Sequence, residues 1–352
     1  MAKTASTTKS SGKTATKTKR PTKGKPTSKK PKAAAPVAVE KPVAKKSVAP
    51  RIDIAQEITD RILAELKNGA LPWVKPWRAL PTSGMPSNFS SGRPYSGVNV
   101  LTLWAAQEVA GYPTAQWISY DQAAALGGQV RKGERGTKIV FVGSGEKKDE
   151  NGEKDGGRYS FLRTFSVFNI AQCDGLPVKE QPDRRVAETA VRDEWADAFI
   201  TATGAVIREG SGEAYYIPSR DFINLPSFPS FNSPDHYYAT SFHEIGHWTG
   251  ADKRLSRKLK GPYGSVEYAA EELVAELTSA FLCAEFGFNG DVRHAGYIEN
   301  WIKLLENDKK AFMTAASQAS KAHQYLRGLA IAEGAPTSAA IEMEDAPLMM
   351  AA

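Results

Sequence analysis

The stretch FHEIGHWTG, residues 242–250, places two histidines four positions apart, with a glutamate directly after the first of them. Residues four apart lie on the same face of an α-helix, so His243 and His247 point the same way and can share one cation. The preceding segment has the features of a helix start. Ser233 offers a side-chain cap, a proline fits the first helical position, and an acid follows near the positive end of the helix dipole. The pattern predicts a helix that ends at Gly250 and carries a metal-binding face.

The segment from His243 to His247 has the form HExxH, which is typical of zinc metallopeptidases. In such a site, zinc polarises a water molecule, and the glutamate, here Glu244, deprotonates that water for attack on a carbonyl. The other interpretation is an amphipathic helix with two solvated histidines. We expect Zn²⁺ as the cofactor, and a site of imidazole and carboxylate ligands also accepts Mn²⁺ or Co²⁺.

A second helix, predicted in GSVEYAAEELVAELTSAFLCAEFG (264–287) with Ser265 as its cap, offers the further ligand that such a site needs. Glu272 and Glu276 share one face of this helix at i and i+4. We expect Glu272 to ligate the metal and Glu276 to orient a ligating imidazole. Glu271 lies one position off that face and is expected in solvent. Alternatively, all three are surface carboxylates, because glutamate is a good helix former.

The charge of the chain is unevenly distributed along its 352 residues. The net charge is +7, yet residues 1–50 alone hold 14 Lys and Arg against one acid, Glu40. This arm has few large apolar side chains, so we expect it to be disordered and able to bind DNA phosphates, including those of double-stranded DNA. A solubilising linker or a localisation signal is the other interpretation. No apolar run is long enough to span a membrane, and the two cysteines, Cys173 and Cys283, lack metal-type spacing.

The segment after this arm interleaves aromatic and basic residues, a pattern found where single-stranded nucleic acid is bound. Bases stack on aromatic faces while cations neutralise phosphates. Tryptophans are more often core residues, and that interpretation stays open. The candidate DNA-binding residues are Trp73, Trp77, Arg78, Arg93, Tyr95, Asn99, Arg131, Lys132, Arg135 and Lys138.

Four local patterns define the remaining structure that we expect. Residues 53–69 form a helix that ends at a glycine, and two strands are joined through KGERG (132–136). Residues 143–157 have no hydrophobic pattern and are expected to form an exposed loop. The stretch AYYIPSRDFINL (214–225) predicts a hairpin, from which Tyr215 or Tyr216 could reach the site.

The sequence resembles the ArdC family of antirestriction proteins in both halves. The similar segments are WVKPWR, SGRPYSGVNVLTLW, WISYDQAAALGGQVRKGERGTKIVF and FSVFNIAQCDGL, followed by YYIPSRDFINLPSFPSF, YYATSFHEIGHWTG and YAAEELVAELTSAFLC. The resemblance implies an N-terminal domain that binds single-stranded DNA and a C-terminal zincin-like (gluzincin-like) metallopeptidase domain. By motif, it assigns metal ligation to His243, His247 and Glu272 and the catalytic base to Glu244.

We therefore predict an α+β protein, in which an α+β domain that binds single-stranded DNA precedes a mostly helical zincin-like domain. The expected divisions are a basic arm (1–50), the DNA-binding domain (51–185), the metallopeptidase domain (186–332) and a flexible tail (333–352). The resemblance implies that the role is to shield plasmid or phage DNA from host restriction, and we expect the protein in the bacterial cytoplasm. Two alternatives stay open: a metalloprotease acting on DNA-associated proteins, and a DNA-coating protein whose metal is purely structural.

Overall fold

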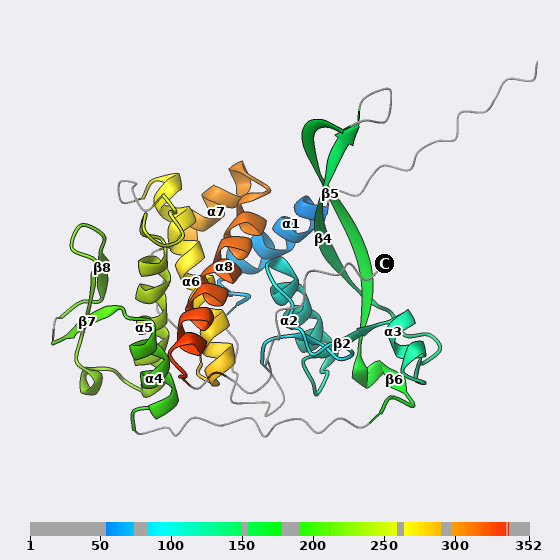
Figure 1. The fold of residues 1–352 in the computed structure, drawn as a ribbon, viewed down its shortest axis with the longest axis horizontal. Coiled ribbons are helices and arrows are strands. Elements are labelled where there is room, and N and C mark those ends of the chain that lie inside the picture. The colour runs from blue at the N-terminus through cyan, green and yellow to red at the C-terminus, as the bar shows by residue number, and fades with distance from the viewer. Residues whose placement is uncertain are drawn as a thin grey trace, which may run out of the picture. The chain divides into compact units, whose positions relative to one another are not determined.

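A computed structural model describes residues 54–73, 84–148, 154–177, 191–210, 212–258, 264–289, 297–335 and 337, with only the backbone at 146–148 and 154–160. The expected basic arm, the boundary near residue 185 and most of the expected C-terminal tail lie outside these residues. Among the described helices, none is long and apolar enough to cross a membrane. The fold class is α+β, as predicted (Figure 1).

The described part of the N-terminal half combines three helices with a four-stranded sheet. Its elements are α1 (Ile54–Lys67), β1 (Ser87–Asn88), α2 (Val98–Ala110), β2 (Gln116–Ser119), α3 (Tyr120–Ala125), β3 (Gln129–Val130), β4 (Thr137–Lys148), β5 (Lys154–Asn169), a 3₁₀ turn (Ile170–Gln172) and β6 (Cys173–Asp174). The sheet order is β1-β2-β5-β4, with β1 and β2 parallel and the other pairs antiparallel. The strands on either side of KGERG belong to different sheets, because β3 pairs with β6.

The longest pairing in the sheet is between β4 and β5, and it corrects the loop expected over residues 143–157. The two strands stay paired from Thr137 opposite Val167 to Lys148 opposite Lys154. In Figure 1 this ribbon runs on past α2. A two-stranded ribbon beyond the core has no buried face to impose alternating polarity, so its outer part gave no strand pattern in the sequence.

The C-terminal half is mostly helical. Its elements are α4 (Glu194–Ala202), β7 (Val206–Glu209), β8 (Tyr215–Ile217), β9 (Phe222–Leu225), a 3₁₀ turn (Phe228–Ser230), α5 (Pro234–Thr249), α6 (Val266–Phe286), α7 (Ile298–Asn307) and α8 (Ala311–Ala332). The predicted hairpin is confirmed as the antiparallel pair β8 and β9, and β7 lies parallel to β9. The predicted caps are also confirmed: Ser233 accepts a hydrogen bond from the His236 N–H, and Ser265 accepts one from the Tyr268 N–H.

One hydrophobic core contains residues from both halves of the chain. The predicted stripe of α1 buries Ile62 and Leu66, and both join the core that α5, α6 and α8 form. Trp73 follows α1 and is fully buried, with its ring centroid 5.5 Å from that of Trp301 and 6.0 Å from that of Phe312. The N-terminal segment of the chain therefore packs directly among the helices around the candidate site. The division near residue 185 stays a prediction.

Candidate metal centre

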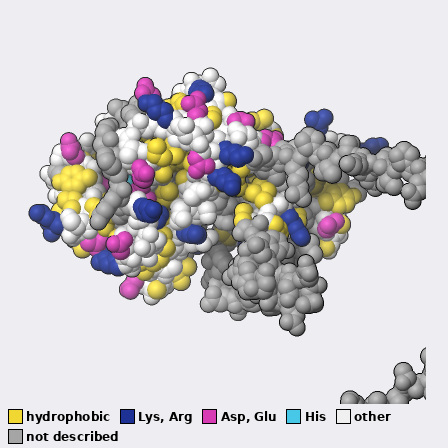
Figure 2. Space-filling model, turned by 90° about the horizontal axis from the view of Figure 1, so that it is seen from above, with side chains coloured by type: hydrophobic (Ala, Val, Ile, Leu, Met, Phe, Trp, Pro, Cys, Tyr) yellow, Lys and Arg dark blue, Asp and Glu magenta, His cyan; other side chains and the backbone are white. Residues whose placement is uncertain are grey.

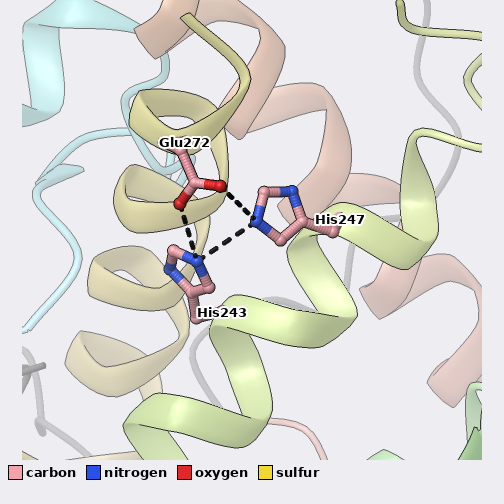
Figure 3. A group of neighbouring side chains, drawn as sticks. All are labelled: His243, His247 and Glu272. Carbon is pink, nitrogen blue, oxygen red and sulfur yellow. Dashed lines mark hydrogen bonds and ion pairs between the residues drawn. The ribbon is translucent and has the colours of Figure 1, made fainter. Parts of the chain in front are cut away.

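Helices α5 and α6 bring together the three residues expected to ligate a metal. His243 and His247 lie one turn apart on α5, and Glu272 faces them from α6 (Figure 3). A glycine between the histidines permits this approach: a Cβ on Gly246 would lie 3.1 Å from the Cα of Ala275. The Ser279 hydroxyl also donates a hydrogen bond to the Ala239 carbonyl at 2.7 Å, which ties the two helices together.

The spacing of the three side chains fits a small divalent cation. The Nε2 atoms of His243 and His247 lie 3.2 Å apart. The Glu272 carboxylate is 3.4 Å from His243 Nε2 and 3.5 Å from His247 Nε2. Ligands arranged tetrahedrally at zinc-like distances of 2.0–2.1 Å are separated from each other by about 3.3 Å. Two imidazoles and one carboxylate at these separations therefore form three corners of a site that leaves one position open.

A glutamate predicted to lie in solvent proves to support the second histidine. Glu271 is only 8% exposed, and its Oε1 lies 3.3 Å from His247 Nδ1. The Arg257 guanidinium donates to both Glu271 oxygens, at 3.0 and 2.7 Å, and also to the Thr249 hydroxyl and the Gly246 carbonyl. The prediction for Glu271 was wrong because α6 is buried on nearly all sides, so that lying off one buried face does not place a residue in water.

Glu276 occupies the corresponding position beside the first histidine. Its Oε2 lies 3.5 Å from His243 Nδ1, and it is 1% exposed. The indole N–H of Trp73 donates to the other Glu276 oxygen at 3.2 Å. A residue 203 positions earlier in the chain therefore holds the carboxylate that faces a candidate ligand. In this structure, each imidazole has a carboxylate next to its Nδ1, the arrangement that fixes ring orientation in metal sites.

The electrostatic environment favours positive charge between the two helices. Burial disfavours an imidazolium, but Glu272 and Glu276 raise the pKa of His243 well above its usual value. Glu271 and Glu272 likewise raise the pKa of His247 to about 9 against the effect of burial. Burial alone would raise the pKa of Glu272, but the two imidazoles hold it well below its usual range. The same negative charge of the carboxylates that favours the imidazolium forms would also stabilise a bound divalent cation.

Glu244 differs from the other three acidic groups of the centre. It is 7% exposed, and the described residues offer it no hydrogen bond or ion pair. Its carboxylate is close enough to His243 to help raise the pKa of that imidazole. Glu244 therefore lies beside the ligands with its oxygens uncommitted, as a proton acceptor requires. Tyr216, one of the two tyrosines considered for the site, instead hydrogen-bonds Asp221 and Arg254.

Comparison with known proteins identifies both halves of the chain. Residues 52–168 match the model of the N-terminal domain of anti-restriction factor ArdC, and residues 194–318 match a zincin-like metallopeptidase model. The crystal structure of the metal-free antirestriction protein ArdC from plasmid R388 is 41% identical, with a TM-score of 0.69 over 80% of this chain and 98% of that one. The chain belongs to the ArdC family of antirestriction proteins.

Other members and relatives extend this result. The Mn(II)-bound structure of the R388 protein is 39% identical, with a TM-score of 0.66 over 79% of this chain and 98% of that one. An uncharacterized protein of Sinorhizobium fredii, y4eC, is 40% identical over 76% of this chain and 90% of its own length. A DNA primase TraC of Escherichia coli is 39% identical over 77% of this chain, which spans only 27% of the primase. The zincin-like domain and the Mn(II)-bound relative indicate a divalent-metal site in this chain.

Three of the described candidate DNA-binding residues of this ArdC-family chain are held in contacts within the fold. Trp73 is buried against the metal centre, so the expectation that its ring is open to a base is wrong. The Asn99 amide bonds the backbone N–H and carbonyl of Val140, both at 2.8 Å, and thereby fastens α2 to β4. Tyr95 is half-buried, and its hydroxyl accepts a hydrogen bond from Asn88 at 3.4 Å. Trp77 and Arg78 lie outside the described residues.

The basic candidates remain open to a phosphate, with one exception. Arg93, Lys132, Arg135 and Lys138 are exposed and form no ion pair within the described part of the chain. Arg131 is already paired, with Glu134 at 2.9 Å and Asp174 at 3.4 Å. On the face that Figure 2 shows, basic and acidic side chains are interspersed.

The sequence did not indicate the roles of Glu271, Arg257 and Trp73 at the metal centre, because no local pattern marks a contact made across the fold.

Proposed function

We propose that this ArdC-family protein binds single-stranded DNA through its N-terminal half and carries a zinc-dependent, peptidase-like site in its C-terminal half. Its proposed role is to protect incoming plasmid or phage DNA from host restriction, in the bacterial cytoplasm. The observation that carries the proposal is the convergence of His243, His247 and Glu272 beside the uncommitted carboxylate of Glu244. The antirestriction family supports the biological role.

The residues of the centre divide the work between holding an ion and moving a proton. His243, His247 and Glu272 would hold the ion, with Zn²⁺ as the proposed native metal and Mn²⁺ or Co²⁺ as substitutes. When bound, such an ion acts as a Lewis acid that lowers the pKa of a water molecule. Glu244 would take the proton from that water at its carboxylate oxygen, since it lies next to the ligands and is not paired. Glu271 and Glu276 keep the two imidazole rings in position.

Two alternatives share this architecture. A purely structural metal is disfavoured by the ligand set, because structural zinc normally takes four protein ligands and the candidate group here has three. A metalloprotease that DNA binding delivers to proteins on DNA uses the same residues and differs only in its substrate. The basic arm (1–50) adds a second proposed DNA contact, which would extend to double-stranded DNA through phosphates.

The test of the centre is the metal content of three purified full-length proteins. Wild type, Glu244→Gln and His243→Ala are each loaded with Zn²⁺, Mn²⁺ or Co²⁺, dialysed, and assayed for bound metal and for binding of single-stranded DNA. Wild type and Glu244→Gln are expected to retain metal equally, because Glu244 is not a ligand. His243→Ala is expected to lose it while DNA binding persists. Unchanged metal content in His243→Ala would overturn the ligand assignment.

A further inference from the structure

The ribbon formed by β4 and β5 exposes a group of large apolar side chains in its outer part. Phe141 is 36% exposed and Phe165 is 41% exposed, while Phe161 is half-buried. The strand register pairs Phe141 with Arg163, Ile139 with Phe165 and Gly143 with Phe161. Residues directly opposite each other lie on the same face of an antiparallel pair. The three rings and Arg163 therefore lie on one side of the ribbon, which we call the aromatic face.

The rings of the aromatic face form a row across the two strands. The Phe141 ring centroid lies 6.4 Å from that of Phe165 and 6.4 Å from that of Phe161. Gly143 makes room for the last ring, because a Cβ at this position would lie 2.4 Å from the Phe161 ring. The spacing is about twice the ~3.4 Å rise between stacked bases. Successive rings can therefore take separate bases of an unpaired strand.

The charge around the aromatic face is positive. Arg163 lies on this face, Arg135 precedes β4, and residues 135–145 and 161–172 contain no aspartate or glutamate. Lys138, which is paired with Ser166, lies on the opposite face. The Arg163 guanidinium lies 4.9 Å from the Phe161 ring centroid, and Arg163 is exposed. A cation beside exposed rings matches a ligand that combines flat apolar bases with a phosphate backbone.

We propose that the aromatic face of the β4–β5 ribbon is the base-stacking surface for single-stranded DNA, with Phe141 and Phe165 as its main contacts. This inference rests on the proposed function and gives it a location, in place of the buried Trp73. Duplex DNA is disfavoured as the occupant because its bases are already stacked on each other.

The opposite face of the same ribbon provides a matched control. Val142 and Leu162 are paired with each other there, and they are 63% and 41% exposed. They offer apolar surface in the same segment but no aromatic ring. Replacing them with alanine changes ribbon hydrophobicity to a similar extent without touching the aromatic face.

The experiment measures the affinity of the full-length protein for a fluorescent single-stranded oligonucleotide and for a duplex of the same sequence. The proteins are wild type, Phe141→Ala/Phe165→Ala, Phe141→Trp/Phe165→Trp and the Val142→Ala/Leu162→Ala control. Because one base stack is worth roughly 1–3 kcal/mol, each lost ring should weaken single-strand binding by about 5- to 150-fold. The tryptophan variant should bind at least as tightly as wild type. The Val142→Ala/Leu162→Ala control should bind as tightly as wild type.

The outcomes separate this inference from the proposed function. If wild type does not bind single-stranded DNA, the proposed function itself fails. If wild type binds and the double alanine variant binds equally well, only the aromatic face is overturned. Equal losses in the double alanine variant and the control would also overturn it, because ribbon folding would then be the cause. Cross-linking of a bromodeoxyuridine oligonucleotide, mapped by mass spectrometry, should label residues 139–165, and labelling confined to other segments would contradict the proposal.

Discussion

The candidate metal centre and the aromatic face illustrate two opposite ways in which a chain can prepare a site. At the metal centre, side chains from three distant segments are buried and held by one another, as in the chain from Trp73 through Glu276 to His243. On the aromatic face, rings from two neighbouring strands are left partly in water. The first site is defined by partners that the protein supplies. The second is defined by surface that a ligand would have to cover. Variants at the first should therefore alter metal affinity, and variants at the second should alter DNA affinity alone.

The largest effect that sharpens this contrast is expected from Glu271→Gln. Removing the charge weakens the carboxylate partner of His247 and leaves Arg257 buried without its acid. Loss of such a partner typically lowers metal affinity 10- to 100-fold. Metal affinity can be measured by competition with a chromogenic chelator, at a temperature where the variant is folded. Binding of single-stranded DNA is measured on the same protein. The DNA affinity should stay at the wild-type value.

The same helix supplies a control of nearly identical chemistry. Glu285 is buried near the C-terminal end of α6, where it pairs with His323 at 2.7 Å and with Arg327, both on α8. Breaking either buried network should cost roughly 3–5 kcal/mol of unfolding free energy. Glu285→Gln should therefore be destabilised as Glu271→Gln is, yet keep the wild-type metal affinity. Equal metal affinities for the two variants would remove the assigned role of Glu271.

A smaller effect is expected from Trp73→Phe. Phenylalanine keeps most of the buried ring but removes the N–H that donates to Glu276. Trp301→Phe is the control, because the neighbouring Trp301 donates to the Ala269 carbonyl and not to the centre. Each variant should lose about 1 kcal/mol of stability with its hydrogen bond. Only Trp73→Phe should weaken metal binding, by up to about tenfold, and the reverted protein should regain the wild-type metal affinity. Identical metal affinities in both variants would limit Trp73 to packing.

These contacts also explain which features of the fold and of the site could be predicted from the sequence. The spacing in HExxH and the i, i+4 glutamates are local features of single helices, and the structure brings His243, His247 and Glu272 together. Trp73 was interpreted as a base platform because its neighbours alternate with cations, and only the tertiary fold shows that it is buried. The outer β4–β5 ribbon was missed because strands with two exposed faces need no hydrophobic alternation.

The smallest effect concerns the hairpin beside α5 and its dependence on pH. Arg254 donates two hydrogen bonds to Asp221, and with Lys253 these hold the pKa of that carboxyl well below its usual value. A depressed pKa contributes stability that is present above the unfolded value of about 3.9 and is lost as the pH falls below it. Asp221→Asn should cost about 1 kcal/mol at neutral pH, given the partial exposure of the pair. Asparagine also tolerates the positive φ of 51° at this position.

Urea unfolding at a series of pH values checks this prediction. Wild type should lose stability relative to Asp221→Asn progressively as the pH falls below about 4, so that the two curves approach each other toward low pH. The aromatic face contains no carboxylate, and its alanine variants should leave the acid slope unchanged. Parallel curves for wild type and Asp221→Asn would contradict the role of this ion pair.

If the metal centre performs chemistry, the survival of unmodified DNA that enters restricting cells should depend on Glu244. The cells express wild type or Glu244→Gln at matched levels, since this variant keeps the three ligands and the DNA-binding half. Wild type is expected to protect the DNA, and Glu244→Gln is expected not to. Equal protection by both proteins would contradict this expectation, and would leave protection to the DNA-binding half alone.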